Sequence, residues 1–194
     1  MQIDRTNLDN VSVDIHRELI EQSKNGIRVA QYELYKLYSK AMYNICYRLL
    51  NNRNVAEDIL QDTFIDAFTK LDLFRYESTF GAWLKQIAVN KCLNELNKTK
   101  TNFEFIDIEN YDFAEENGAI NEEELKMSVA KVKEATEQLP EGCRVVFSLY
   151  SFEGYDHQEI ARILKISEST SKTQYMRAKQ LIKEMLIKNN YATR

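Results

Sequence analysis

The pattern of apolar and polar residues in the first hundred positions predicts helices. Apolar side chains recur every three or four residues over 28–50, which places them on one face of a helix. The expected buried stripe consists of Leu34, Tyr38, Ala41, Ile45 and Leu49. A shorter helix over 14–23 precedes it and ends before the turn-forming pair Asn25-Gly26.

A third helix is expected over 55–71. Asn54 can cap it by accepting hydrogen bonds from the free backbone amides of the first turn. Its inward stripe consists of Leu60, Phe64, Ala67, Phe68 and Leu71. Its outward face carries Asp58, Asp62, Ile65 and Asp66 at helical spacing. This helix therefore has one apolar face and one face that is mainly acidic.

The first domain is expected to end with a fourth helix. This helix runs over 80–98, follows an aromatic-rich connection and can be capped by Ser78 or Thr79. The four helices predict an independent domain over 14–100. Residues 101–122 show no sustained period and are acidic, so we expect an extended linker there.

A second helical domain is expected over 123–189. Pro140 suits the first turn of its second helix. Asp156 and Glu159 form the sequence signature of a capping box that opens a short third helix, and Ser167 can cap the last helix. The expected buried stripe of that helix consists of Ile166, Tyr175, Ala178, Ile182 and Met185. A short helix, a tight turn and a longer helix form a helix-turn-helix layout.

Composition supports an all-α protein made of two small helical domains joined by an acidic linker. The chain has only five Gly and one Pro, with 44% hydrophobic and 29% charged residues. No apolar run approaches the length of a membrane span, so membrane insertion is not expected. The three Cys lack CxxC spacing and no secretory leader precedes them, which predicts a cytoplasmic protein with reduced thiols.

Charge is distributed unevenly along the chain. The net charge is −4, but nine acidic residues and no Lys or Arg lie within 101–124, so the rest carries +5. Residues 81–100 contain four Lys and one Glu. Residues 156–194 contain eight basic and four acidic residues. These two basic segments are the parts of the chain that a polyanion would attract.

The helix-turn-helix layout predicts contact with DNA. The small residues Ser169 and Thr170 let the start of the last helix approach the major groove, where the helix N-terminus also favours phosphate. Base-edge and backbone contacts are expected from Lys172, Gln174, Arg177 and Lys179. The alternative is a solvated basic face on a helical hairpin.

Two stretches of the sequence resemble a known family. The stretch LPEGCRVVFSLYSFEGYDHQEIARILKISESTSKTQYMRAKQLI resembles region 4 of the extracytoplasmic-function (ECF) sigma factors, which reads the promoter −35 element. AEDILQDTFIDAFTKL followed by FGAWLKQIAVNKCLNEL resembles region 2 of the same family. The resemblance covers 28–188. It implies a sigma factor that binds core RNA polymerase and directs promoter-specific initiation.

The resemblance implies polymerase contacts for the outward face of the third helix. In this family the region 2 helix docks on the clamp helices of the beta prime subunit, and the beta subunit is a further partner. The residues that we expect to bind polymerase are Asp58, Gln61, Asp62, Ile65 and Asp66. A mixed acidic and apolar face suits a basic, partly apolar helical pair. The alternative is a merely solvated acidic face.

The following loop and helix resemble the element that reads and melts the −10 element. Phe80 and Trp83 are expected to pack in the core, which leaves stacking on unpaired bases mainly to Tyr76 and its loop. The expected −10 residues are Arg75, Tyr76, Ser78, Lys85, Asn90, Lys91, Asn94 and Lys98. Val89 and Asn97 stand where many relatives carry Arg, so the phosphate contacts here are expected to be weaker or placed elsewhere.

The resemblance also implies which residues read the −35 element. They are Ser169, Thr170, Lys172, Thr173, Gln174, Met176, Arg177 and Lys179. Gln174 stands where Arg is common, which makes adenine a candidate for that contact. The linker is expected to thread the basic channel of the polymerase, with an ordinary solubilising tether as the alternative. An anti-sigma factor is a further expected partner, since regulation by one is typical of the family.

Two other classes of protein are alternatives to a sigma factor. A free-standing helix-turn-helix regulator would bind duplex DNA without polymerase, and the region 2 resemblance argues against it. An enzyme is not expected, because the sequence shows no metal-spaced His and Asp cluster, no Gly-rich phosphate loop and no nucleophile beside a base. Neither a cofactor nor a metal is expected.

Overall fold

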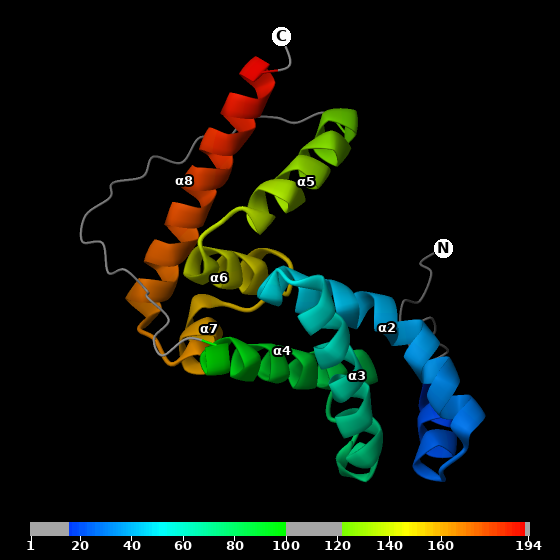
Figure 1. The fold of residues 1–194 in the computed structure, drawn as a ribbon. Helices are drawn as coiled ribbons and strands as arrows, with labels where there is room; N and C mark the ends of the chain where they lie inside the picture. The colour runs from blue at the N-terminus through cyan, green and yellow to red at the C-terminus, as the bar shows by residue number, and fades with distance from the viewer. Residues whose placement is uncertain (1–15, 100–121, 193–194) are drawn as a thin grey trace, which may run out of the picture. The chain divides into compact units, whose positions relative to one another are not determined.

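The structure is a computed structural model in which residues 16–99 and 122–192 are described. All regular elements in these two ranges are helical, as Figure 1 shows. The chain divides into two compact units at Leu96 and Asn97. The all-helical prediction is therefore confirmed for the described residues, whereas most of the expected linker lies outside them. None of the described helices is long and apolar enough to cross a membrane.

The described part of the first unit contains four α-helices and a short 3-10 helix. A helix over 16–24 is followed by α2 (Arg28–Leu50), α3 (Arg53–Thr69), η1 (Leu71–Leu73) and α4 (Phe80–Thr99). Helices α2 and α3 pack against each other, with Tyr35 and Phe64 meeting edge to face at 4.8 Å between ring centroids. The centre of the core is formed by the fully buried side chains of Leu34, Leu49, Leu71 and Leu84.

The buried stripe predicted on α2 is confirmed at three positions, whereas Tyr38 is half-buried and the prediction for Ala41 is wrong. Leu34, Ile45 and Leu49 are buried, but Ala41 is exposed and Met42 is buried in its place. Neighbouring helical residues point about 100° apart, so only one of this pair can face the core. The larger Met42 side chain takes the inward position because it buries more apolar area.

The caps of α3 and α4 were only partly predicted. Asn52, not Asn54, caps α3: its Oδ1 accepts a hydrogen bond from the Val55 backbone amide at 3.3 Å. Asn54 lies inside the first turn, since the helix begins at Arg53, two residues before the predicted start. At α4 the Thr79 hydroxyl accepts from the Ala82 amide at 3.2 Å. Thr79 is therefore the cap among the two predicted candidates.

The second unit consists of α5 (Glu122–Glu137), α6 (Glu141–Ser151), α7 (His157–Leu164) and α8 (Glu168–Ala192). Pro140 lies at the N-cap of α6, one position before the predicted first turn. The buried side chains that join α5, α6 and α8 are Ala135, Leu139, Cys143, Phe147, Ala178 and Ile182. Tyr175 and Met185 pack against this cluster, which agrees with the stripe predicted on the last helix.

The predicted helix starts around the helix-turn-helix turn are confirmed. Asp156 Oδ1 accepts from the Glu159 amide and Glu159 Oε2 accepts from the Asp156 amide, both at 2.8 Å, which completes the capping box. Ser167 Oγ accepts from the Thr170 amide at 2.9 Å at the start of α8. Lys165 ends α7 in the left-handed region, with φ of 56°. The direction of α8 is thus set by local hydrogen bonds on both sides of the turn.

Candidate nucleic-acid interface

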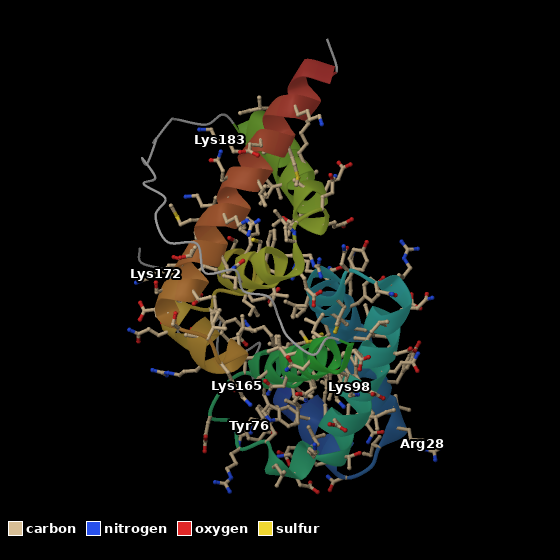
Figure 2. All side chains as sticks on the ribbon, turned by 60° about the vertical axis from the view of Figure 1, so that its left-hand side comes forward. Arg28, Tyr76, Lys98, Lys165, Lys172 and Lys183 are labelled. Carbon is tan, nitrogen blue, oxygen red and sulfur yellow. The ribbon has the colours of Figure 1, made fainter. Side chains whose placement is uncertain are left out.

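The last helix, α8, presents basic side chains beside the turn that joins it to α7. Figure 2 shows Lys165 at this turn and Lys172 and Lys183 along α8. Lys172 and Lys179 are exposed, and Arg177 is half-buried. Lys172 Nζ forms an ion pair with Glu168 at 2.7 Å, in which both side chains remain partly exposed. An exposed pair of this kind is weak, so Lys172 can exchange this partner for a phosphate at little cost.

The other predicted −35 residues lie in different environments. Ser169 is exposed, whereas Thr173 and Met176 are half-buried. The Thr173 hydroxyl donates a hydrogen bond to the Ser169 carbonyl at 3.0 Å, as Thr often does within a helix. Its oxygen still has lone pairs that can accept from a base. These residues place a row of polar and apolar groups beside the lysines of α8.

Two predicted −35 residues are buried, which argues against their direct contact with DNA. Gln174 is 2% exposed, and its Oε1 accepts a hydrogen bond from the Cys143 thiol of α6 at 3.1 Å. Thr170 is 8% exposed, and its hydroxyl lies 2.7 Å from that of Ser167. Both side chains point into the second unit because α8 packs there against α6 and α7. We therefore remove Gln174 and Thr170 from the candidate DNA-contacting set.

An aromatic cluster, Tyr150, His157 and Tyr175, joins α6, α7 and α8 beneath the turn. His157 stacks on Tyr150 with 4.5 Å between ring centroids, and Tyr175 lies 4.5 Å from Tyr150. His157 Nδ1 lies 2.9 Å from the hydroxyl of Ser171, which is fully buried at the start of α8. Burial, and next the charge of Lys172, lower the pKa of His157, so the ring is neutral at pH 7. His157 therefore positions α7 against α8.

In the first unit, the loop before α4 carries the aromatic residue expected to meet a base. Tyr76 has φ of 61°, a left-handed conformation that residues with a side chain seldom adopt. Its ring packs against Phe74 at 4.8 Å and its hydroxyl donates to Glu21 Oε1 at 2.5 Å. Burial, followed by the hydrogen bond to Glu21, raises the pKa of Tyr76 to about 12, so the hydroxyl keeps its proton at neutral pH.

The remaining predicted −10 residues lie on this loop and along α4. Those with exposed side chains are Arg75, Ser78, Asn90, Asn94 and Lys98, and those that are half-buried are Lys85 and Lys91. Val89 is buried. Phe74 and Phe80 are also buried, as expected for Phe80, whereas Tyr76 and Trp83 are both half-buried, so the expected core position of Trp83 is only partly met.

The outward face of α3 presents most of the residues predicted to bind polymerase. Asp58, Gln61 and Asp62 are exposed, and Ile65 is 62% exposed. Asp66 differs, because its carboxylate pairs with Lys91 at 3.1 Å and with Lys70 at 3.2 Å. These two lysines lower the pKa of Asp66 and offset its charge. The uncompensated part of the acidic face is therefore centred on Asp58 and Asp62.

No sequence pattern indicated three residues that organise these surfaces. Glu21 and Lys24 of the first helix reach Tyr76 and the loop before α4. Cys143 on α6 holds the buried amide of Gln174. Each contact joins separate elements, so no spacing along the chain could indicate it. Within the described ranges, no cluster of three or more His, Cys, Asp or Glu could hold a metal.

Comparison with known proteins places both units in one family. Residues 34–101 match the model of Sigma-70 region 2, and residues 129–182 match the model of Sigma-70 region 4. The ECF RNA polymerase sigma factor SigW of Bacillus subtilis is 29% identical over 181 residues, which cover 88% of this chain and 96% of that protein. The ECF RNA polymerase sigma-E factor of Escherichia coli K12 is 30% identical over 179 residues, covering 84% and 90%.

Solved structures share the fold. CnrH in complex with the cytosolic domain of CnrY aligns with a TM-score of 0.51 and 24% identity, over 88% of this chain and 96% of that chain. RpoE in complex with the anti-sigma factor NepR from Bartonella quintana aligns with a TM-score of 0.51 and 23% identity, over 80% and 95%. Because region 2 and region 4 follow one another and relatives align over most of their length, the chain belongs to the ECF group of sigma-70 family RNA polymerase sigma factors, which direct transcription initiation.

Proposed function

We propose that this chain binds core RNA polymerase and positions it on promoters by contacting the −35 element with α8 and the −10 element with the first unit. The observation that carries this proposal is a helix-turn-helix with exposed lysines in a chain that also matches region 2. A free-standing regulator has no need of a polymerase-binding domain, so the region 2 match favours the sigma mechanism. The polymerase is a cytoplasmic enzyme, and we place this chain in the same compartment.

We propose a division of labour along the chain. Residues 14–100 act as region 2, residues 101–122 as an acidic linker that runs through the basic polymerase channel, and residues 123–189 as region 4. The two units each have their own buried core, which supports separate contacts with separate promoter elements. None of these contacts makes or breaks a covalent bond, so the chain acts by binding alone.

The polymerase contact is proposed for the α3 face formed by Asp58, Gln61, Asp62 and Ile65. Its acidic side chains are exposed, and an apolar side chain is 62% exposed among them. Such a face pairs well with a basic helical partner that has an apolar strip, which is the chemistry expected of the beta prime clamp helices. Asp66 is a weaker candidate, since Lys91 and Lys70 already offset its charge.

The DNA contacts are proposed for two surfaces. On α8, phosphates and base edges of the −35 element meet the exposed or half-buried side chains of Ser169, Lys172, Thr173, Met176, Arg177 and Lys179. In the first unit, an unpaired base of the −10 element stacks on Tyr76. The neighbouring polar and basic contacts come from Arg75, Ser78, Lys85, Asn90, Lys91, Asn94 and Lys98. Lys91 must release Asp66 to reach a phosphate.

An anti-sigma protein is the regulatory partner that we propose. The similar solved structures are of CnrH with the cytosolic domain of CnrY and of RpoE with the anti-sigma factor NepR. A protein of that class would compete with core polymerase for the same exposed surfaces. The proposal is tested by finding whether a protein captured by this chain blocks its transcription with core polymerase.

The first test is assembly with purified bacterial core polymerase. Wild-type protein is expected to co-purify with core and to start transcripts at defined positions on a library of duplex templates with randomised promoter segments. Replacing Asp58 and Asp62 by Lys is expected to weaken binding to core without changing the helical content. The matched control, Glu134→Lys with Glu184→Lys, makes the same change in charge at two exposed positions of the second unit.

Two results would contradict these assignments. If the Asp58 and Asp62 variant binds core as tightly as the control variant, the α3 face is not the docking surface. If the wild-type protein ignores core and instead shifts duplex DNA alone, the chain is a free-standing regulator and the sigma mechanism fails.

A further inference from the structure

The helix over 16–24 contacts the loop that carries Tyr76, although it lies outside the segment that matches region 2. Glu21 Oε1 accepts the Tyr76 hydroxyl at 2.5 Å. Lys24 Nζ donates to the Phe74 carbonyl at 3.4 Å and pairs with Glu21 at 3.2 Å. One short helix therefore holds the loop through both a side chain and the backbone.

These contacts restrain a residue in an uncommon conformation. Tyr76 has φ of 61°, and a non-glycine residue keeps such a conformation only where its surroundings hold it. Its ring lies 4.7 Å from Lys24 Nζ and 5.1 Å from the Arg17 guanidinium carbon, measured to the ring centroid. Both cations lie within the range of cation–π attraction. The hydroxyl hydrogen bond, the two cations and Phe74 together determine where the ring points.

The helix over 16–24 also has its own attachment to the rest of the first unit. The Tyr38 hydroxyl lies 2.8 Å from His16 Nδ1, and Gln31 Nε2 donates to the Ser23 carbonyl at 3.3 Å. The Tyr38 ring in turn meets Phe80 at the start of α4, with 5.2 Å between centroids. These contacts do not involve Glu21 or Tyr76. The helix can therefore stay in place when the contact between those two side chains is removed.

We propose that Glu21 is a positioning residue for −10 recognition, which fixes the Tyr76 ring in the orientation that receives an unpaired base. This inference rests on the proposed function, because it assigns a role within the −10 contact. The Glu21 side chain is 51% exposed; it accepts the Tyr76 hydroxyl and forms an ion pair with Lys24. A carboxylate at that level of exposure adds little to the core, whereas its hydrogen bond restrains the half-buried ring of Tyr76.

The role assigned to Glu21 makes the helix before the region 2 match part of the promoter reader. Glu21 touches no base itself, since its effect passes through the Tyr76 hydroxyl. The base preference of the protein at the promoter position that meets Tyr76 thus depends on Glu21, which lies outside the segment that matches region 2. Removing either partner of the hydrogen bond frees the ring and lets it accept different bases more equally.

The test is transcription by core polymerase with full-length variants on a template library randomised over the −10 element. Wild-type protein is expected to enrich particular bases at the position that meets Tyr76. Glu21→Ala and Tyr76→Phe are each expected to reduce that enrichment by about tenfold, the order of magnitude of one hydrogen bond to a charged group. Preferences at the −35 element should not change, because the second unit is untouched.

Two further variants separate positioning from general stability. Glu21→Gln keeps a carbonyl oxygen that can accept from Tyr76, so it should restore most of the base preference. The double variant with Glu21→Ala and Tyr76→Phe should match either single variant, because the two changes remove the same hydrogen bond. Glu18→Ala, on the same helix, removes a carboxylate that accepts from Gln22 Nε2 at 3.2 Å; it serves as the matched control and should behave as wild type.

The possible outcomes separate a failure of the Glu21 role from a failure of the proposed function. If Glu21→Ala keeps the wild-type base preference, or lowers all transcripts equally together with thermal stability, the positioning role is overturned. If the effects of Glu21→Ala and Tyr76→Phe add fully, the two residues act separately and the role is again overturned. A wild-type protein that binds core but starts no defined transcripts would instead overturn the proposed function, and this role with it.

Discussion

Replacing Gln174 by Ala distinguishes two hypotheses about this residue of α8, a contact with a DNA base and a buried structural role. Its position on the helix suggests a base contact, whereas the structure buries it against Cys143 with 2% exposure. A base-contacting residue can be truncated with little effect on the free protein. Truncation of a buried residue destabilises the free protein, because it leaves both a cavity and a polar group without its partner. The two hypotheses therefore predict opposite effects on stability.

The magnitude follows from what the truncation removes. Burial raises the pKa of Cys143, so the thiol is protonated at neutral pH and donates to Gln174 Oε1. The variant loses this weak hydrogen bond and the packing of the buried side chain around it. We expect a loss of about 2 kcal/mol in the free energy of unfolding of the second unit. For a domain of this size, that lowers Tm by about 10 °C.

The chain offers a built-in control for the assay. Its single tryptophan, Trp83, lies on α4 in the first unit, so fluorescence reports that unit, whereas far-ultraviolet circular dichroism reports helices of both. Gln174→Ala should move the circular dichroism transition to lower temperature and leave the Trp83 transition in place. Lys172→Ala, at an exposed position of the same helix, should change stability by less than about 0.5 kcal/mol.

A stable variant with altered specificity would contradict the buried position of Gln174. If Gln174→Ala melts like wild type but changes the preferred bases of the −35 element, then Gln174 faces DNA. A destabilised variant that retains the wild-type base preference would show that the buried position seen in the structure governs its role.

Three further predictions follow from the caps, the buried histidine and the basic helix. Asn52→Ala should cost about 1 kcal/mol in the free energy of unfolding of the first unit, whereas Asn54→Ala should cost less, as measured by urea denaturation. The pKa of His157 is lowered in the folded state, so just below about pH 6.5 the unfolded chain binds more protons than the folded one. The free energy of unfolding should therefore fall as the pH drops through that range. His157→Gln should remove this pH dependence. Lys172→Ala and Arg177→Ala should each weaken holoenzyme binding to −35 DNA. Each should also make the slope of log binding constant against log salt concentration shallower by about one per lost phosphate contact. An unchanged slope would exclude that phosphate contact.

Much of the fold could be predicted because its helices are amphipathic and their ends carry local signals. The capping box of Asp156 and Glu159 needs only residues three apart, and the structure forms it as predicted. The misassigned cap shows the limit of such signals. Asn52 and Asn54 both suit an N-cap, and the choice between them depends on where α3 must begin to place Ala56 and Leu60 in the core.

The candidate site was less predictable, because it depends on which side chains face another element. The spacing of Lys172, Gln174 and Arg177 along α8 is the same whether Gln174 meets DNA or the core. Likewise, Asp66 belongs to the acidic pattern of α3, but Lys91 of α4 neutralises it across the interface. Contacts between separate elements decide such cases, and no local pattern encodes them.

By itself, the sequence determined the helices, the two units, the uneven charge and the resemblance to an ECF sigma factor, because apolar periodicity, caps and charge are properties of neighbouring residues. Only the tertiary structure decided which face of α8 is buried, which carboxylates are already paired, and that Glu21 reaches Tyr76. Those facts depend on residues as far as 55 positions apart, which meet only after the helices have packed. The physical reason is that burial of apolar stripes fixes the orientation of each helix, and each polar side chain then takes the partner that this orientation offers.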